Sequence, residues 1–127
     1  MLDTSVIIDL MTIERERLPL EGTIAALTIA ELTAGPVAAS DAVQRAQRLE
    51  RLQQTEALFE TIPFDRAAAH AYARIYAAAM LVNQKPRGSR AVDMLIAATA
   101  LSRGIPLYTR NPHDFGAVAT LMEIVAV

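Results

Sequence analysis

Residues 89–104 read SRAVDMLIAATALSRG, and this stretch decides the fold class. It is mostly apolar and long enough for a helix, Ser89 is a suitable N-cap, and Gly104 is the type of residue that ends helices. We predict a helix that runs to Arg103, followed directly by a strand at Pro106–Tyr108. A helix that leads straight into a short apolar strand is typical of α/β domains.

Two further helices are predicted upstream of this stretch. Asp41–Ala57 carries apolar residues at helical spacing, and Asp65 is placed as the N-cap of a helix from Arg66 to about Val82. A loop, Asn83–Gly88, then leads to the helix described above. The helix that follows Asp65 is apolar around most of its circumference, which predicts burial on several sides or contact with another subunit.

Short strand candidates alternate with these helices. They are Met1–Asp3, Thr23–Leu27, Leu58–Ile62, Pro106–Tyr108 and Glu123–Val127. Such alternation predicts an α/β fold with a mostly parallel sheet covered on both faces. Sites in these sheets form at the carboxyl ends of the strands. This rule places Asp3, the turn near Thr28–Glu31, and Thr109–Asp114 in candidate positions.

Composition narrows the class of protein. The chain has 127 residues, and we expect residues 1–127 to form one domain. It has no cysteine, which excludes disulfides and zinc–thiolate sites. The sequence shows neither an apolar run that could span a bilayer nor a signal peptide, so we expect a cytoplasmic protein without membrane contact. A net charge of −2 disfavours a protein that coats RNA, but not an enzyme that reaches phosphate through a metal.

Four carboxylates lie at strand ends or helix starts, and each has a purely structural alternative. Asp3 suits a helix N-cap, and Glu31 suits a capping box with Thr28. Asp93 suits the favourable end of a helix dipole, and Asp114 suits an Asx-turn. The structural explanation is weakest for Asp93, because its helix face is apolar and no opposite charge stands four residues away. An unpaired buried charge is costly.

Considered together, the four carboxylates predict a metal site. Gathered at one edge of the sheet they would repel one another, and some would take up a proton unless a divalent cation lay between them. Oxygen ligands without cysteine or a histidine pair suit Mg²⁺, or Mn²⁺, rather than zinc. Such a metal can activate water for in-line attack on a phosphodiester and stabilise the leaving oxygen.

Four segments of the chain resemble the motifs of PIN-domain toxins of the VapC type. They are Leu2–Ile7 (LDTSVI), Thr28–Leu32 (TIAEL), Arg90–Ala100 (RAVDMLIAATA) and Tyr108–Phe115 (YTRNPHDF), in the family's order across essentially the whole chain. The resemblance implies a PIN fold, with a central, mostly parallel sheet of about five short strands flanked by helices. It also implies the toxic component of a VapBC-type system. This is an endoribonuclease that needs Mg²⁺ or Mn²⁺, cleaves transfer or ribosomal RNA, and is inhibited by a VapB-type antitoxin.

The resemblance assigns roles position by position. Asp3 and Asp93 match the metal-binding aspartates, and Glu31 matches the acidic residue that completes the site, directly or through water. Either Thr4 or Ser5 is expected to orient a water or a carboxylate.

Two features depart from the family pattern. Only two residues precede Asp3, so the first strand is short or the start has been trimmed. Asn111 stands where some PIN proteins carry Asp, so the fourth acidic role falls to Asp114 or is shared between the two. Thr109, just before this segment, is expected to support the site.

Basic residues near the carboxylates are expected to steer RNA phosphates toward the metal: Lys85, Arg87, Arg90 and Arg110. The alternative for each is a solvated surface position. The apolar helix Arg66–Val82 and the helix that carries Arg45, Arg48 and Arg51 are candidates for a homodimer contact and an antitoxin groove.

Two other classes of protein remain as alternatives. A phosphotransfer domain would use Asp3 as its nucleophile, but phosphatases of this kind want a second Asp where Ser5 stands. Receiver domains want an acidic pair before the phosphorylated Asp, and Asp3 lies too near the start for that. The second alternative is a PIN-like domain that only binds RNA or a partner protein. Metal-dependent cleavage distinguishes it from the nuclease.

Overall fold

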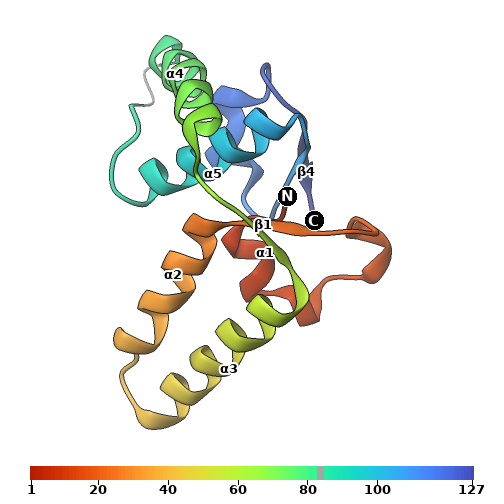
Figure 1. Ribbon diagram of the computed structural model, residues 1–127, viewed down its shortest axis with the longest axis vertical. Coiled ribbons are helices and arrows are strands. Elements are labelled where there is room, and N and C mark those ends of the chain that lie inside the picture. Colours follow the sequence, from red (N-terminus) through yellow and green to blue (C-terminus); the bar gives the residue numbers. More distant parts are fainter. Residues whose placement is uncertain (83–84) are drawn as a thin grey trace.

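The computed structural model describes residues 1–82 and 85–127, so the predicted loop Asn83–Gly88 lies partly outside the described residues. In chain order the elements are α1 (Thr4–Ile8), η1 (Leu10–Thr12), η2 (Arg15–Arg17), β1 (Thr23–Ala25), α2 (Ala26–Val37), α3 (Ala42–Leu58), β2 (Glu60–Ile62), α4 (Arg66–Leu81), α5 (Ser89–Arg103), β3 (Leu107–Thr109), η3 (Pro112–Val118) and β4 (Ile124–Ala126). The η elements are short 3₁₀ helices. Figure 1 shows α4 and α5 on one side of the strands, and α2 and α3 as a hairpin that extends from the other side.

The four strands form two parallel pairs. β1 pairs with β2, with Thr23 opposite Glu60, and β3 pairs with β4, with Leu107 opposite Ile124. Parallel strands need a crossover between them, and α2–α3 and η3 provide the two crossovers. The predicted α/β architecture with parallel strands is confirmed.

Leu2 joins the two strand pairs. It forms single parallel bridges to Ile24 and to Tyr108. The Leu2 N–H donates to the Thr23 carbonyl at 2.8 Å, and the Asp3 N–H donates to the Tyr108 carbonyl at 2.9 Å. The prediction of about five strands was therefore wrong in one respect: the first strand shrinks to one bridging residue, because α1 begins directly after Asp3.

Two predicted helix ends, at Asp65 and Gly104, rest on local chemistry and hold in the structure, and Asp41 caps the helix that was predicted to begin with it. The Asp41 side chain accepts from the Gln44 N–H at 2.8 Å, and that of Asp65 accepts from the Ala68 N–H at 3.0 Å. Gly104 ends α5 in the left-handed conformation, with φ of 64°.

Other predicted boundaries were wrong. The strand predicted to reach Leu27 ends at Ala25, because α2 starts three residues earlier than the proposed capping box requires. Thr28 is therefore the third residue of α2 and is fully buried, not a cap. Ser89 is likewise the first residue of α5, and Gly88 precedes it as the N-cap without a side-chain bond.

The core has two parts, one on each face of the strands. Neighbouring residues of a strand point to opposite faces, so Ala25 belongs to the cluster beside α4 and α5, while Ile24 belongs to the cluster beside α1 and α2. Met94 and Ile96 of α5 are fully buried in the first cluster, whereas Leu2 is buried in the second.

Helix α4 buries one face rather than several within this chain. Ala68, Ala71, Ile75 and Ala79 recur at helical spacing and are buried, and α4 packs closely on α5. Met80, Leu81 and Val82 at its far end are exposed. Neither α4 nor any other helix within residues 1–82 and 85–127 is long and apolar enough to cross a membrane.

Candidate metal centre

The four predicted carboxylates lie on four different elements. Asp3 comes directly after the bridging Leu2, and Asp114 lies in the first turn of η3, just beyond β3. Glu31 and Asp93 lie in the second turns of α2 and α5. Asp3 is only 4% exposed, and the other three are partly buried.

The Asp3 carboxylate has two different oxygens. Its Oδ2 accepts from the Ser5 hydroxyl at 2.7 Å and from the Thr109 hydroxyl at 2.9 Å. Its Oδ1 is buried, and no described protein group hydrogen-bonds to it. Asp3 occupies the N-cap position of α1, but its side chain does not bond the amides of that helix. The N-cap alternative therefore does not account for Asp3, whereas a cation at Oδ1 would satisfy the unpaired oxygen.

The same two hydroxyls also hold the chain that follows β3. Ser5 Oγ accepts from the Arg110 N–H at 3.1 Å, and Thr109 Oγ1 accepts from the Asn111 N–H at 3.0 Å. The two hydroxyl oxygens lie 3.4 Å apart. The predicted supporting position of Ser5 and Thr109 thus corresponds to a direct contact with Asp3.

Glu31 is held by the other hydroxyl of α1. Thr4 Oγ1 donates to Glu31 Oε2 in a short hydrogen bond, and Thr4 Oγ1 lies 3.2 Å from Thr28 Oγ1. The neighbouring residues Thr4 and Ser5 therefore serve different carboxylates. The part played by Thr28 was missed, because nothing in the sequence signals a contact between residues 24 positions apart.

Asp93 shows that the four carboxylates form one electrostatic cluster. The pKa of Asp93 is raised to about 6, chiefly by burial and then by the negative charges of Asp3, Glu31 and Asp114, while the charge of Arg90 opposes the shift. Arg90 stands three residues before Asp93 and is therefore its neighbour on the same helix face, although no opposite charge lies four residues away. Because Asp93 lies beyond the first turn of α5, the helix dipole offsets little of this cost.

The donor set fits a hard divalent cation. A buried oxygen without a partner, a raised carboxyl pKa and the absence of sulfur ligands are all properties of a magnesium or manganese site. Within the described part of the chain, no three acidic or histidine side chains already converge as a closed set of ligands. Mg²⁺ suits such an open arrangement, because it keeps several waters and takes only one or two carboxylates from the protein.

The four predicted RNA-steering residues differ in their surroundings. Lys85 and Arg87 are exposed on the chain that leads into α5, and Arg90 is partly buried beside Asp93. Arg110 instead pairs with Asp9 at 3.3 Å, and its guanidinium donates to the Val127 carbonyl at 3.2 Å. Arg110 is thus already engaged at the end of α1.

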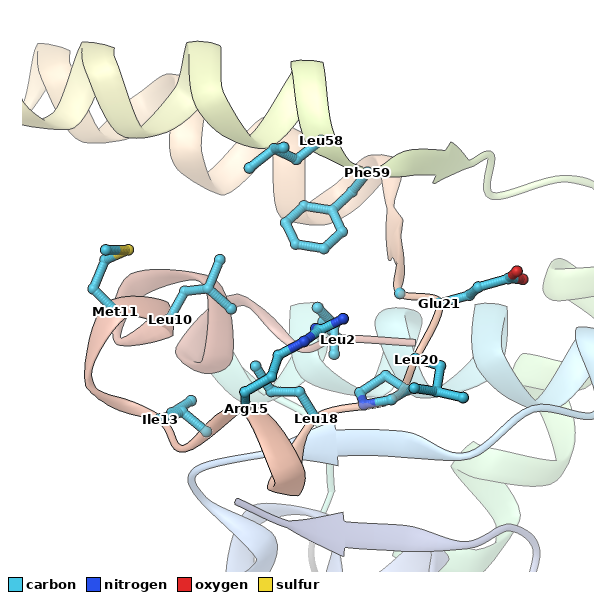
Figure 2. A pocket seen from close by; sticks show the side chains of 12 residues that line it. Leu2, Leu10, Met11, Ile13, Arg15, Leu18, Leu20, Glu21, Leu58 and Phe59 are labelled. Atoms are coloured by element: carbon cyan, nitrogen blue, oxygen red, sulfur yellow. The ribbon is translucent and has the colours of Figure 1, made fainter.

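An extended hollow of the surface lies apart from the carboxylates. It is an apolar groove of about 740 Å³ between the η1–η2 segment and the end of α3 (Figure 2). Its lining comprises Leu2, Leu10, Met11, Ile13, Arg15, Leu18, Pro19, Leu20, Glu21, Gly22, Leu58 and Phe59. A second groove of about 490 Å³ continues along α3, shares Leu58 and Phe59, and includes Arg51 of the predicted arginine face.

Comparison with known proteins identifies the fold family. The PIN domain model matches residues 1–121. Ribonuclease VapC5 of Mycobacterium tuberculosis is 36% identical over 131 residues, which is 99% of this chain and 93% of the relative. Ribonuclease VapC of Rickettsia bellii is 33% identical over 103 residues, 80% of this chain and 72% of the relative. The crystal structure of VapBC-5, a toxin–antitoxin system of M. tuberculosis, contains a chain with a TM-score of 0.83 and 34% identity, covering 99% of this chain and 96% of that one.

The raised pKa of Asp93 predicts a pH-dependent effect of Asp93→Asn on metal-free protein. The folded state binds the Asp93 proton more tightly than the unfolded chain does, so the contribution of Asp93 to wild-type stability falls as the pH rises from about 4 to about 6. We expect the variant to unfold at higher urea concentration than the wild type at pH 7–8, and the advantage to vanish near pH 4. Asp41→Asn, the same change at an exposed helix cap, is the control. A variant less stable than the wild type at pH 8 would contradict the clustering of charge.

Proposed function

The chain belongs to the PIN-domain family, related to the VapC ribonucleases of VapBC toxin–antitoxin systems, and we propose that it is the toxin of such a system. In this proposal residues 1–127 act as a single PIN domain. The activity is that of a Mg²⁺-dependent endoribonuclease, a hydrolase that cleaves phosphodiester bonds of transfer or ribosomal RNA. Mn²⁺ has the same ligand preference and could replace Mg²⁺.

Two features of neighbouring carboxylates carry the proposal: the Oδ1 of Asp3 is buried without a hydrogen-bond partner, and the pKa of Asp93 is raised. We assign the metal to these two residues. When bound there, Mg²⁺ supplies an activated water for in-line attack and stabilises the charge on the leaving oxygen.

The other polar side chains position the reacting groups. Thr4 donates to Glu31 Oε2, which leaves Oε1 free to orient the attacking water, directly or through a second water, and to accept its proton. We assign the fourth acidic position to Asp114, because its charge acts on Asp93, whereas Asn111 is exposed and contacts Thr109 through its backbone. Asn111 then serves mainly to shape the loop.

Positive charge beside the cluster gives RNA phosphates a route to the metal. Lys85, Arg87 and Arg90 precede Asp93 and are the proposed steering residues. Of the three, Arg90 acts on Asp93 itself and opposes the rise of its pKa. Arg110 is the weakest member of the predicted set, because using it for RNA would compete with its contacts to Asp9 and Val127.

Two protein partners complete the proposal. The similar solved chain comes from a toxin–antitoxin complex, which supports a VapB-type antitoxin as partner, and the apolar groove offers a place for an apolar segment of it. The exposed apolar end of α4 supports a homodimer. If the antitoxin did not suppress cleavage, the proposed antitoxin partner would be wrong. If light scattering at micromolar concentration gave a monomeric mass, the proposed homodimer would be wrong.

Cleavage of RNA tests the proposed activity. End-labelled bacterial RNA incubated with antitoxin-free protein should give discrete fragments with Mg²⁺ and none with EDTA. Asp93→Asn should lower the cleavage rate at least about a hundredfold, because it removes a metal-binding charge. Asp41→Asn is the matched control and should cleave like the wild type, since Asn caps a helix as well as Asp does. A folded wild-type protein that binds RNA without cleaving it would favour the non-catalytic alternative.

Substitution of the steering residues should weaken RNA binding. Arg87→Ala with Arg90→Ala should reduce RNA affinity several-fold and lower the dependence of binding on salt by about one ion per lost contact. Arg45→Ala, which removes an exposed arginine from α3, is the control. Unchanged affinity and unchanged salt dependence in the double variant would show that these residues are only solvated surface positions. Filter binding with catalytically inactive protein measures both quantities.

A further inference from the structure

We infer that Thr109 and Ser5 are positioning residues through which Asp3 holds the loop that carries the fourth carboxylate. Residues 110–114 connect β3 to Asp114, and their attachment to Asp3 runs through these two hydroxyls. Metal ligand and loop then behave as one unit. The inference rests on the proposed function for its catalytic meaning, but the network itself can be tested without metal or RNA.

The direction of each hydrogen bond follows from the charge on Asp3. An ionised carboxylate only accepts, and a hydroxyl has a single proton and two lone pairs. Ser5 and Thr109 must therefore both turn their protons toward Asp3 Oδ2, at 2.7 and 2.9 Å. Their lone pairs are then left to accept the backbone N–H groups of Arg110 and Asn111.

A continuous path of hydrogen bonds links Asp3 to Asp114. Thr109 joins Asp3 Oδ2 to the Asn111 N–H, and the Asn111 carbonyl accepts from the Asp114 N–H at 3.0 Å. The two ends of this path are far apart in sequence, so local propensity alone does not position Asp114 relative to Asp3. The hydroxyl of Thr109 does so, from a residue with no exposed surface.

The same arrangement orients the metal-facing oxygen. Two donors on Oδ2 fix the plane of the Asp3 carboxylate, and the remaining oxygen, Oδ1, is the one without a partner. Because Thr109 is fully buried, water cannot readily replace its hydroxyl. Loss of this hydroxyl should therefore affect both the loop and the affinity for metal.

The test compares Thr109→Val, which keeps the shape and removes the hydroxyl, with Thr109→Ser, which keeps the hydroxyl. Thr99→Val is the matched control, because Thr99 is equally buried but donates only to the Leu95 carbonyl within α5. Hydrogen exchange of metal-free protein reports on the amides of Arg110 and Asn111. Titration with Mn²⁺ reports on the affinity for metal.

We expect the Asn111 amide, which donates to Thr109 Oγ1, to exchange about tenfold faster in Thr109→Val, as loss of one hydrogen bond predicts, and at the wild-type rate in Thr109→Ser and Thr99→Val. The Arg110 amide, which donates to Ser5 Oγ, is the internal reference. Mn²⁺ affinity should fall about 10- to 100-fold in Thr109→Val alone.

If hydrogen exchange of the loop were unchanged in Thr109→Val, the proposed hydrogen-bond network would be wrong. If the affinity for Mn²⁺ were unchanged, the positioning role of Thr109 would be wrong. A Thr109→Ser variant as impaired as Thr109→Val would also overturn it, because shape rather than the hydroxyl would then matter. Wild-type protein that bound no Mn²⁺ and cleaved no RNA would instead overturn the proposed function, while the exchange rates would still decide on the network.

Discussion

Carboxylates that share a site repel one another, and the position of Asp3 determines how this chain accommodates that repulsion. Asp3 follows Leu2, the residue that joins both strand pairs, so it cannot move away without disturbing the centre of the fold. Two hydroxyl donors stabilise one of its oxygens, and the other remains buried and unpartnered. The remaining repulsion acts on Asp93. Burial and the neighbouring negative charges together raise the pKa of Asp93 to about 6. A divalent cation is the simplest group that would relieve both residues.

Features set by local chemistry could be predicted from the sequence. The cap at Asp65 and the end of α5 at Gly104 each depend on one residue and its nearest neighbours. The start of α2 could not be predicted, because Thr23–Leu27 suits a strand and a helix equally until its neighbours are known. The first strand was predicted to be longer than it is for a similar reason, since Leu2 alone is enough to join the two strand pairs.

The candidate site was predictable in its residue types but not in its connections. Four carboxylates in a largely apolar chain pointed to a metal, and the family resemblance assigned their roles. That Thr4 contacts Glu31 while Thr109 contacts Asp3 depends on the packing of α1 against α2 on one side and β3 on the other. Contacts across about 25 to 105 residues leave no local pattern, and only the folded chain reveals them.

The central claim, that the free oxygen of Asp3 and the carboxylate of Asp93 hold one divalent cation, is tested most directly by anomalous diffraction from crystals grown with Mn²⁺. We predict an anomalous peak within about 2.0–2.3 Å of Asp3 Oδ1 and of an Asp93 carboxylate oxygen, with water in the remaining positions. The peak should disappear in crystals of Asp93→Asn. A peak elsewhere on the protein, or Mn²⁺ bound through Asp3 Oδ2 with the Thr109 bond broken, would contradict the account.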